Sequence, residues 1–144
     1  MKIAIAGDHY TVELVAEVSK LLKSKGIEIE NLGTDNKDKK ITLQDIIPAV
    51  VRKVKNGEVD FGILACGTGV GVEIGANRFK GIRASLCRDS EQAKNARIYD
   101  NANLLCLGSW YKDDVKQIVE AWLSSCFDGN EKRTKMLQDF DALG

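Results

Sequence analysis

The chain has 144 residues and a formal net charge of zero, with 21 basic and 21 acidic residues. This length predicts a single domain over residues 1–144 that buries its own core. The balanced charge gives no attraction to nucleic acid or to a membrane surface. No apolar run approaches the roughly 18 residues of a spanning helix, and the N-terminus turns polar too early for a signal peptide. Four cysteines without Cys-x-x-Cys spacing and a single histidine favour reduced thiols, no metal site and a cytoplasmic location.

Short β-branched runs alternate with longer stretches of helical periodicity, which predicts a parallel sheet with crossover helices. The predicted strands cover residues 2–6, 27–31, 59–65, 82–86 and 103–107. Apolar residues at helical spacing predict helices within 14–22, 46–54 and 115–123. Five strands with helices between them indicate a three-layer Rossmann- or flavodoxin-like α/β domain.

Two features of the helices are less regular. Pro48 is the only proline, and it is tolerated early in its helix if Asp45 lies near the N-cap. The tail, residues 128–144, predicts a mixed-charge helix with only Met136, Leu137 and Phe140 on its apolar side. A helix this thinly apolar can dock on a partner subunit rather than on its own core.

The most informative stretch is the glycine loop, residues 66–71, which runs Cys66-Gly67-Thr68-Gly69-Val70-Gly71 directly after the third predicted strand. Backbone N–H groups of such a loop, at the start of a short helix pattern, form an anion site. Cys66 is a candidate acid/base because a helix N-terminus favours the thiolate; alternatively, it fills space at a strand end, and Thr68 only closes the turn. Neither the Walker pattern nor the dinucleotide fingerprint is present.

Other polar residues follow the strands that should meet this loop at one edge of the sheet. Asp8 and His9 follow the first strand and Arg88 the fourth; Asp8 or Thr11 could instead cap the next helix. The segment 99–103 is expected to be a loop before the fifth strand and so to lie towards the opposite end of that strand. It could still reach a site through a helix end or from a neighbouring subunit. Cys87, Cys106 and Cys126 are interpreted as packing residues.

Several motifs together make the chain recognisable: Gly7-Asp8-His9, Asn31-Leu32-Gly33-Thr34, the glycine loop, Gly75-Ala76-Asn77, Gly81-Ile82-Arg83-Ala84 and Asn101-Ala102-Asn103. In this order they resemble the ribose-5-phosphate isomerase B and galactose-6-phosphate isomerase family over essentially the whole chain. The resemblance implies an aldose–ketose isomerase of a phosphorylated sugar that needs no cofactor or metal. It also implies a homodimer or higher oligomer with active sites between subunits; a similar second chain as partner stays open.

The resemblance also assigns roles to residues. Cys66 matches the base that moves a proton between C1 and C2 of the sugar through a cis-enediolate. Asp8 and His9 match residues that hold sugar hydroxyls or phosphate. A second branch of the family carries a glutamate base at the position of Val72, so Cys66 is the base that this pattern supplies. The loop that stabilises the oxyanion matches Thr68 and the N–H groups of Gly67, Gly69, Val70 and Gly71.

Departures from the family pattern concern the sugar and its phosphate. Ribose-specific members carry a ring-opening histidine and an asparagine where this chain has Tyr99 and Asp100, so those two residues become substrate-binding candidates. A tetrose 4-phosphate, which cannot close a furanose ring, is a natural candidate substrate. Further departures are Leu43 for a tyrosine, Trp110 for an arginine, and Glu131 and Lys135 for two arginines that grip phosphate.

These departures leave Arg88, Arg133 and Lys135 as phosphate candidates, either from the same chain or from a neighbouring subunit. They also keep two alternatives open. One is a non-catalytic partner subunit, or a sugar-phosphate-binding member, of a hetero-oligomeric isomerase. The other is a nucleotide-binding flavodoxin-like module, which the missing phosphate fingerprints disfavour.

Overall fold

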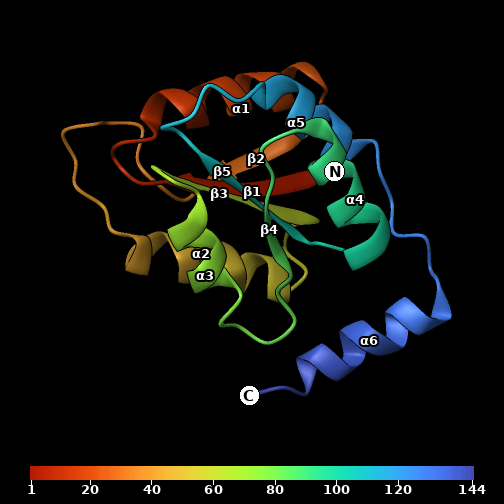
Figure 1. The fold of residues 1–144 in the computed structure, drawn as a ribbon. Helices are drawn as coiled ribbons and strands as arrows, with labels where there is room; N and C mark the ends of the chain where they lie inside the picture. The colour runs from red at the N-terminus through yellow and green to blue at the C-terminus, as the bar shows by residue number, and fades with distance from the viewer.

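The computed structural model describes residues 1–144, which form one five-stranded sheet and six helices (Figure 1). The strands are β1 (Lys2–Gly7), β2 (Glu28–Asn31), β3 (Phe61–Cys66), β4 (Ala84–Leu86) and β5 (Leu104–Gly108). The helices are α1 (Val12–Ser24), α2 (Leu43–Lys55), α3 (Val70–Ala76), α4 (Ser90–Asp100), α5 (Val115–Leu123) and α6 (Glu131–Asp141). None of these helices combines the length and the apolar character needed to cross a membrane.

The sheet is entirely parallel, in the order β2-β1-β3-β5-β4. Successive residues of a strand face opposite sides, so the central strands feed two separate cores. Ile3, Ile63 and Leu105 pack with α1, α4 and α5 on one side, whereas Ala4, Leu64 and Cys106 pack with α2 and α3 on the other. Figure 1 shows these two helical layers on either side of the sheet. The predicted three-layer α/β fold is confirmed.

Local sequence explains how α2 begins. Thr42, and not Asp45, is the N-cap; Asp45 is its capping-box partner and accepts hydrogen bonds from the Thr42 N–H at 3.0 Å and from the Thr42 hydroxyl at 2.7 Å. The prediction that Asp45 lies near the cap holds, but Pro48 then stands in the second turn and inside the helix. Four buried apolar residues of α2 hold the helix against the sheet despite the N–H that proline lacks: Ile46, Ile47, Val50 and Val51.

The short edge strand β4 is held from outside by side chains of α3. The Asn77 amide accepts the Ala84 N–H at 2.8 Å and donates to the Ala84 carbonyl at 2.9 Å. Two residues further along β4, the Leu86 N–H donates to the Glu73 carboxylate at 2.8 Å. These side chains replace the missing neighbouring strand, so part of the Gly75-Ala76-Asn77 motif is structural.

The C-terminal helix α6 lies apart from the sheet at the end of an extended segment (Figure 1). It contacts its own chain through Leu137, which is buried, and through the Asp141 carboxylate, which accepts the Gly81 N–H at 3.1 Å. Phe140 and Leu143 stay exposed. The helix therefore packs partly on its own chain and keeps apolar surface free, and docking on a partner stays a prediction.

Candidate active site

The register of the sheet brings three of the predicted segments together. Gly7 pairs with Ala65 across β1 and β3, and Cys66 pairs with Gly108 across β3 and β5. Asp8 and Ser109 follow those paired positions, so both lie next to the start of the glycine loop. In a parallel sheet these are carboxyl ends of strands, where open α/β folds place their ligands.

Cys66 is the last residue of β3 and is only 5 % exposed. Its Sγ accepts a hydrogen bond from the Gly69 N–H at 3.2 Å, so the loop folds back over the sulfur. An N–H that donates to sulfur stabilises negative charge there. The Val70 N–H donates to the Thr68 hydroxyl at 3.1 Å, which leaves the hydroxyl hydrogen of Thr68 available for a ligand. This geometry suits a group that accepts a proton beside a polar loop.

Two glycines of the loop are required by their surroundings. Gly69 has φ of +75°, a left-handed conformation that side chains disfavour, and forms the N-cap of α3. A Cβ on Gly67 would lie 2.3 Å from Cε2 of the Trp110 indole, so the indole rests directly on that glycine. The backbones of the two loops are also joined, because the Ser109 N–H donates to the Cys66 carbonyl and the Trp110 N–H donates to the Gly67 carbonyl, both at 3.0 Å.

Asp8 and His9 follow the end of β1, on the strand next to β3. The Asp8 carboxylate accepts the Tyr10 N–H at 3.1 Å, and the Asp8 carbonyl accepts the Thr11 hydroxyl at 3.0 Å. Asp8 therefore shapes the turn and does not cap α1, whose N-cap is Thr11 without a side-chain cap bond. The His9 Nδ1 lies 3.3 Å from the Ile41 carbonyl and 3.4 Å from the Ile41 N–H, which leaves Nε2 for another partner.

Two of the other three cysteines are buried, as their interpretation as packing residues requires, and the third is not. Burial raises the pKa of the Cys87 thiol to about 11 and also raises that of Cys106. Both thiols therefore stay protonated at neutral pH. Cys126 is exposed, which contradicts its predicted packing role; it lies in the extended segment between α5 and α6, outside both cores.

Arg88 lies at the carboxyl edge as predicted, but its guanidinium is already engaged. Nε and Nη2 each donate to Asp113 at 3.0 Å, and the guanidinium carbon lies 3.9 Å from the centre of the Tyr111 ring. Pairing with this carboxylate raises the pKa of Arg88. A phosphate would have to compete with Asp113 for this cation.

Four of the predicted site residues lie on α4 and α6, away from the glycine loop: Tyr99, Asp100, Arg133 and Lys135. The expectation of a loop over 99–103 is wrong for Tyr99 and Asp100, which form the last turn of α4, with Asn101 as its left-handed C-cap at φ of +46°. Since α4 runs back from the carboxyl edge, it ends at the opposite edge of the sheet. Arg133 joins Tyr99 there, with its guanidinium carbon 4.6 Å from the ring centre, and pairs with Asp128. Lys135 is exposed on α6 and pairs with Asp139.

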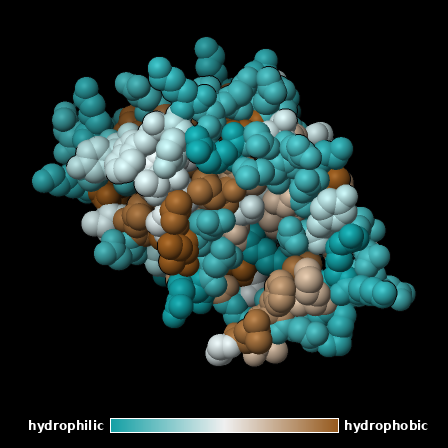
Figure 2. All heavy atoms as spheres, viewed as in Figure 1, coloured by the Kyte–Doolittle hydropathy of each residue, from teal (hydrophilic) through white to brown (hydrophobic).

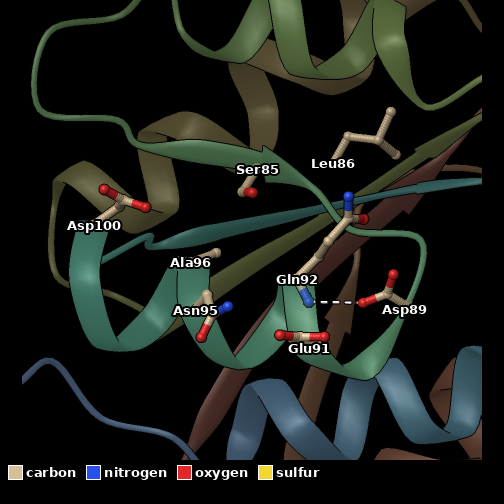
Figure 3. A pocket seen from close by; sticks show the side chains of 8 residues that line it. All are labelled: Ser85, Leu86, Asp89, Glu91, Gln92, Asn95, Ala96 and Asp100. Carbon is tan, nitrogen blue, oxygen red and sulfur yellow. Dashed lines mark hydrogen bonds between the residues drawn. The ribbon is translucent and has the colours of Figure 1, made fainter.

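A shallow polar hollow lies beside β4 and runs along α4 (Figure 3). It is lined by Ser85, Leu86, Asp89, Glu91, Gln92, Asn95, Ala96 and Asp100. Figure 3 shows Asp89 and Asp100 at its two ends, with the Gln92 N–H bound to Asp89 at 2.7 Å. Its three carboxylates make it unsuitable for a phosphate. No three His, Cys, Asp or Glu side chains of the chain come together in a way that could hold a metal ion.

Apolar side chains around the glycine loop are the part of the site that sequence reasoning did not place. A Cβ on Gly71 would lie 3.0 Å from Leu43 Cδ1 and 3.9 Å from Cys66 Sγ. A Cβ on Gly69 would lie 2.5 Å from Leu86 Cδ1. In the sequence, Leu43 stands out only as a departure from the family pattern. Leu86 carries no signal, because a leucine that ends a strand normally belongs to the core.

Comparisons with known proteins show which family shares this sequence and fold. The family described as Ribose/Galactose Isomerase matches residues 3–138. The chain is 36% identical over 137 residues to ribose-5-phosphate isomerase B of Escherichia coli, covering 94% of this chain and 91% of the relative. It is 32% identical over 138 residues to D-erythrulose-4-phosphate isomerase of Pectobacterium atrosepticum, with 94% and 91% covered. A crystal structure of a ribose 5-phosphate isomerase from Thermotoga maritima superimposes with a TM-score of 0.93 at 40% identity, covering 99% of this chain and 98% of that one.

Proposed function

The chain belongs to the ribose/galactose isomerase family and is an aldose–ketose isomerase of a phosphorylated sugar, and we propose that Cys66 is its proton-transfer base. The observation that carries this proposal is the position of the sulfur. Sγ lies at the carboxyl end of a central strand, 3.2 Å from the Gly69 N–H. Thr68 follows two residues later on the same loop, and Asp8 follows Gly7, which pairs with Ala65 on the neighbouring strand. The other buried thiols differ, because Cys106 lies inside β5 and the Cys87 sulfur contacts Ser85 rather than a backbone N–H.

The sulfur and the loop have separate roles in the proposed reaction. The Cys66 thiolate takes the proton from C2 of the open-chain aldose, the electron pair forms the C1–C2 double bond, and the carbonyl oxygen becomes an oxyanion. The Thr68 hydroxyl and the N–H groups of Gly67 and Gly71 donate to that oxygen in this proposal, where negative charge develops. The Gly69 N–H stays bound to Cys66 Sγ and the Val70 N–H to the Thr68 hydroxyl, so these two groups hold the sulfur and the hydroxyl in position. Return of the proton to C1, with transfer of the O2 hydrogen to O1, gives the ketose.

Proton exchange tests this role directly. Cys66→Ser is expected to lower the rate of turnover, and of substrate exchange at C1 and C2 in deuterated water, by at least about 10²-fold, as for loss of a general base. Cys126→Ser is the matched control, because that thiol is exposed and distant from the loop; its rate should equal that of the wild type. An unchanged rate for Cys66→Ser would remove the cysteine from the mechanism.

A tetrose 4-phosphate is the substrate that the site supports best. In this protomer no histidine stands at the end of α4, where Tyr99 and Asp100 lie instead, and a four-carbon sugar phosphate needs no ring opening because its O4 is esterified. The similarity to a D-erythrulose-4-phosphate isomerase supports the same choice. A panel of tetrose, pentose and hexose phosphates should give the highest kcat/KM with the tetrose; a higher value for ribose 5-phosphate would contradict it.

Tyr99, Asp100 and Arg133 are proposed to act on the Cys66 site of a second copy. Arg133 stacks on Tyr99 at the edge of the sheet opposite the glycine loop, so neither reaches Cys66 of its own protomer. On α3, directly beside that loop, Val70 and Ile74 are 42% and 62% exposed. Figure 2 shows apolar atoms over this side of the molecule. A partner that covers α3 would bring its own residues towards the loop.

Complementation between inactive variants distinguishes action within one chain from action between two. Cys66→Ala and Arg133→Ala are each expected to be inactive alone, and co-expression should restore activity. Random pairing puts one intact site in each mixed dimer and gives about one quarter of wild-type activity, since a two-fold dimer has two equivalent sites. No recovery, with mixed dimers demonstrated, would refute this arrangement. Recovery only with a different chain from the source organism would favour the alternative of a hetero-oligomer.

A further inference from the structure

Trp110 combines strong exposure with a fixed position. The side chain is 72% exposed in the protomer, whereas an apolar ring of this size is normally buried. Its backbone is nevertheless tied to the active-site loop, because the Trp110 N–H donates to the Gly67 carbonyl at 3.0 Å. Burial in the core therefore does not explain why a tryptophan stands here.

The ring itself lies on the glycine loop. A Cβ on Gly67 would be 2.3 Å from Cε2, 2.6 Å from Cζ2 and 2.7 Å from Nε1, so the Nε1–Cε2–Cζ2 edge of the indole covers this residue. Gly67 directly follows Cys66, so the indole lies on the loop one residue after the one that carries the sulfur. The ring also lines a hollow with Tyr10, Glu13 and Leu14. Nε1, a hydrogen-bond donor without acceptor capacity, is on the part of the ring nearest the loop.

Leu43 lies on the other side of the loop. Its Cδ1 would be 3.0 Å from a Cβ on Gly71, and Cys66 Sγ would be 3.9 Å from the same point. Besides Cys66, the side chains nearest to a Cβ on Gly67, Gly69 and Gly71 are thus uncharged: Trp110, Leu86 and Leu43. Such walls suit the carbon chain of a sugar phosphate, while its phosphate dianion must point away from them.

We propose that Trp110 determines which sugar phosphates this site accepts. Its indole narrows the approach to Cys66 and packs against the carbon chain of a short, acyclic substrate, and Nε1–H donates to one of the substrate oxygens. A cyclic or longer sugar would have to displace the ring from Gly67. The inference rests on the proposed function of the glycine loop and adds the residue that sets its selectivity.

Substitutions at Trp110 test the wall and the donor separately. Trp110→Ala removes both and should lower kcat/KM for a tetrose 4-phosphate by about 10-fold or more, in the range that apolar contacts give. It should also raise the kcat/KM ratio of pentose to tetrose phosphate. Trp110→Phe keeps an aromatic wall without the N–H, so its selectivity should stay near that of the wild type while KM rises. An unchanged substrate ratio in Trp110→Ala would overturn the proposal.

Fluorescence gives a readout that does not depend on turnover. The chain has two tryptophans, and Trp122 is only 1% exposed in the core, so a ligand on the loop should change the emission of Trp110 alone. 4-Phosphoerythronate, an acid that cannot isomerise, is the probe. Its effect should be present in the wild type and in Cys66→Ser, and absent in Trp110→Phe. An effect that persists in Trp110→Phe refutes the role of Trp110, whereas full turnover by Cys66→Ser refutes only the proposed base.

Discussion

The substitution Gly69→Ala tests whether packing against Leu86 and β5 restricts the glycine loop, in addition to the left-handed backbone of Gly69 itself. Gly69 has φ of +75°, and an alanine in the left-handed region is strained by about 1–2 kcal/mol. Its Cβ would also lie 2.5 Å from Leu86 Cδ1 and 3.0 Å from the Gly108 nitrogen. Leu86 can rotate, but the Gly108 backbone belongs to β5 and cannot yield easily, so overpacking adds about 1–3 kcal/mol.

The expected loss is therefore about 2–5 kcal/mol of the free energy of unfolding. Gly57→Ala is the matched control, because Gly57 has a similar φ of +69° and a Cβ there would meet nothing within 4 Å. Both substitutions change the unfolded chain equally, so the difference between them reports the clash alone. Gly57→Ala should lose only about 1–2 kcal/mol.

Urea unfolding followed by circular dichroism, at one fixed protein concentration, measures both variants. We expect Gly69→Ala to unfold at clearly lower urea than Gly57→Ala, and to lose turnover even where it remains folded, because the Gly69 N–H would move away from Cys66 Sγ. Equal stabilities for the two variants would show that β5 does not confine the loop and would refute this reasoning.

Other outcomes concern the edge strand, the thiols and the tryptophans. Asn77→Ala leaves an N–H and a carbonyl of β4 without partners and should destabilise the fold by about 1–3 kcal/mol in urea; a smaller loss would mean that water replaces the amide. Since burial raises the pKa of Cys87 to about 11, brief alkylation near pH 8 should label the exposed Cys126 first, and mass spectrometry that finds Cys87 labelled first would contradict this. In the same assay, Trp122→Ala should lower the free energy of unfolding by about 3–5 kcal/mol, and Trp110→Ala by under about 0.5 kcal/mol. Comparable losses would mean that Trp110 stabilises the fold.

Some motifs that carried the family resemblance serve the fold rather than the chemistry. The Asn103 side chain accepts the Arg83 N–H at 2.8 Å and donates to the Gly81 carbonyl at 2.9 Å, while Arg83 Nε donates to the Asn101 carbonyl at 2.8 Å. These bonds fasten the segment before β4 to the segment before β5. Sequence alone cannot separate such ties from ligand contacts, because the same polar side chains serve both purposes.

The sequence by itself determined the parallel sheet, the glycine loop and the place of Cys66 at a strand end. Those features follow from local periodicity and from the glycines, which act within a few residues. Tertiary structure alone decided which side chains share a site. The packing of α6 lays Arg133 on Tyr99, and the approach of the β5–α5 loop lays Trp110 on Gly67. Such contacts join residues far apart in the chain, and only the packing of helices and loops on the sheet brings them together.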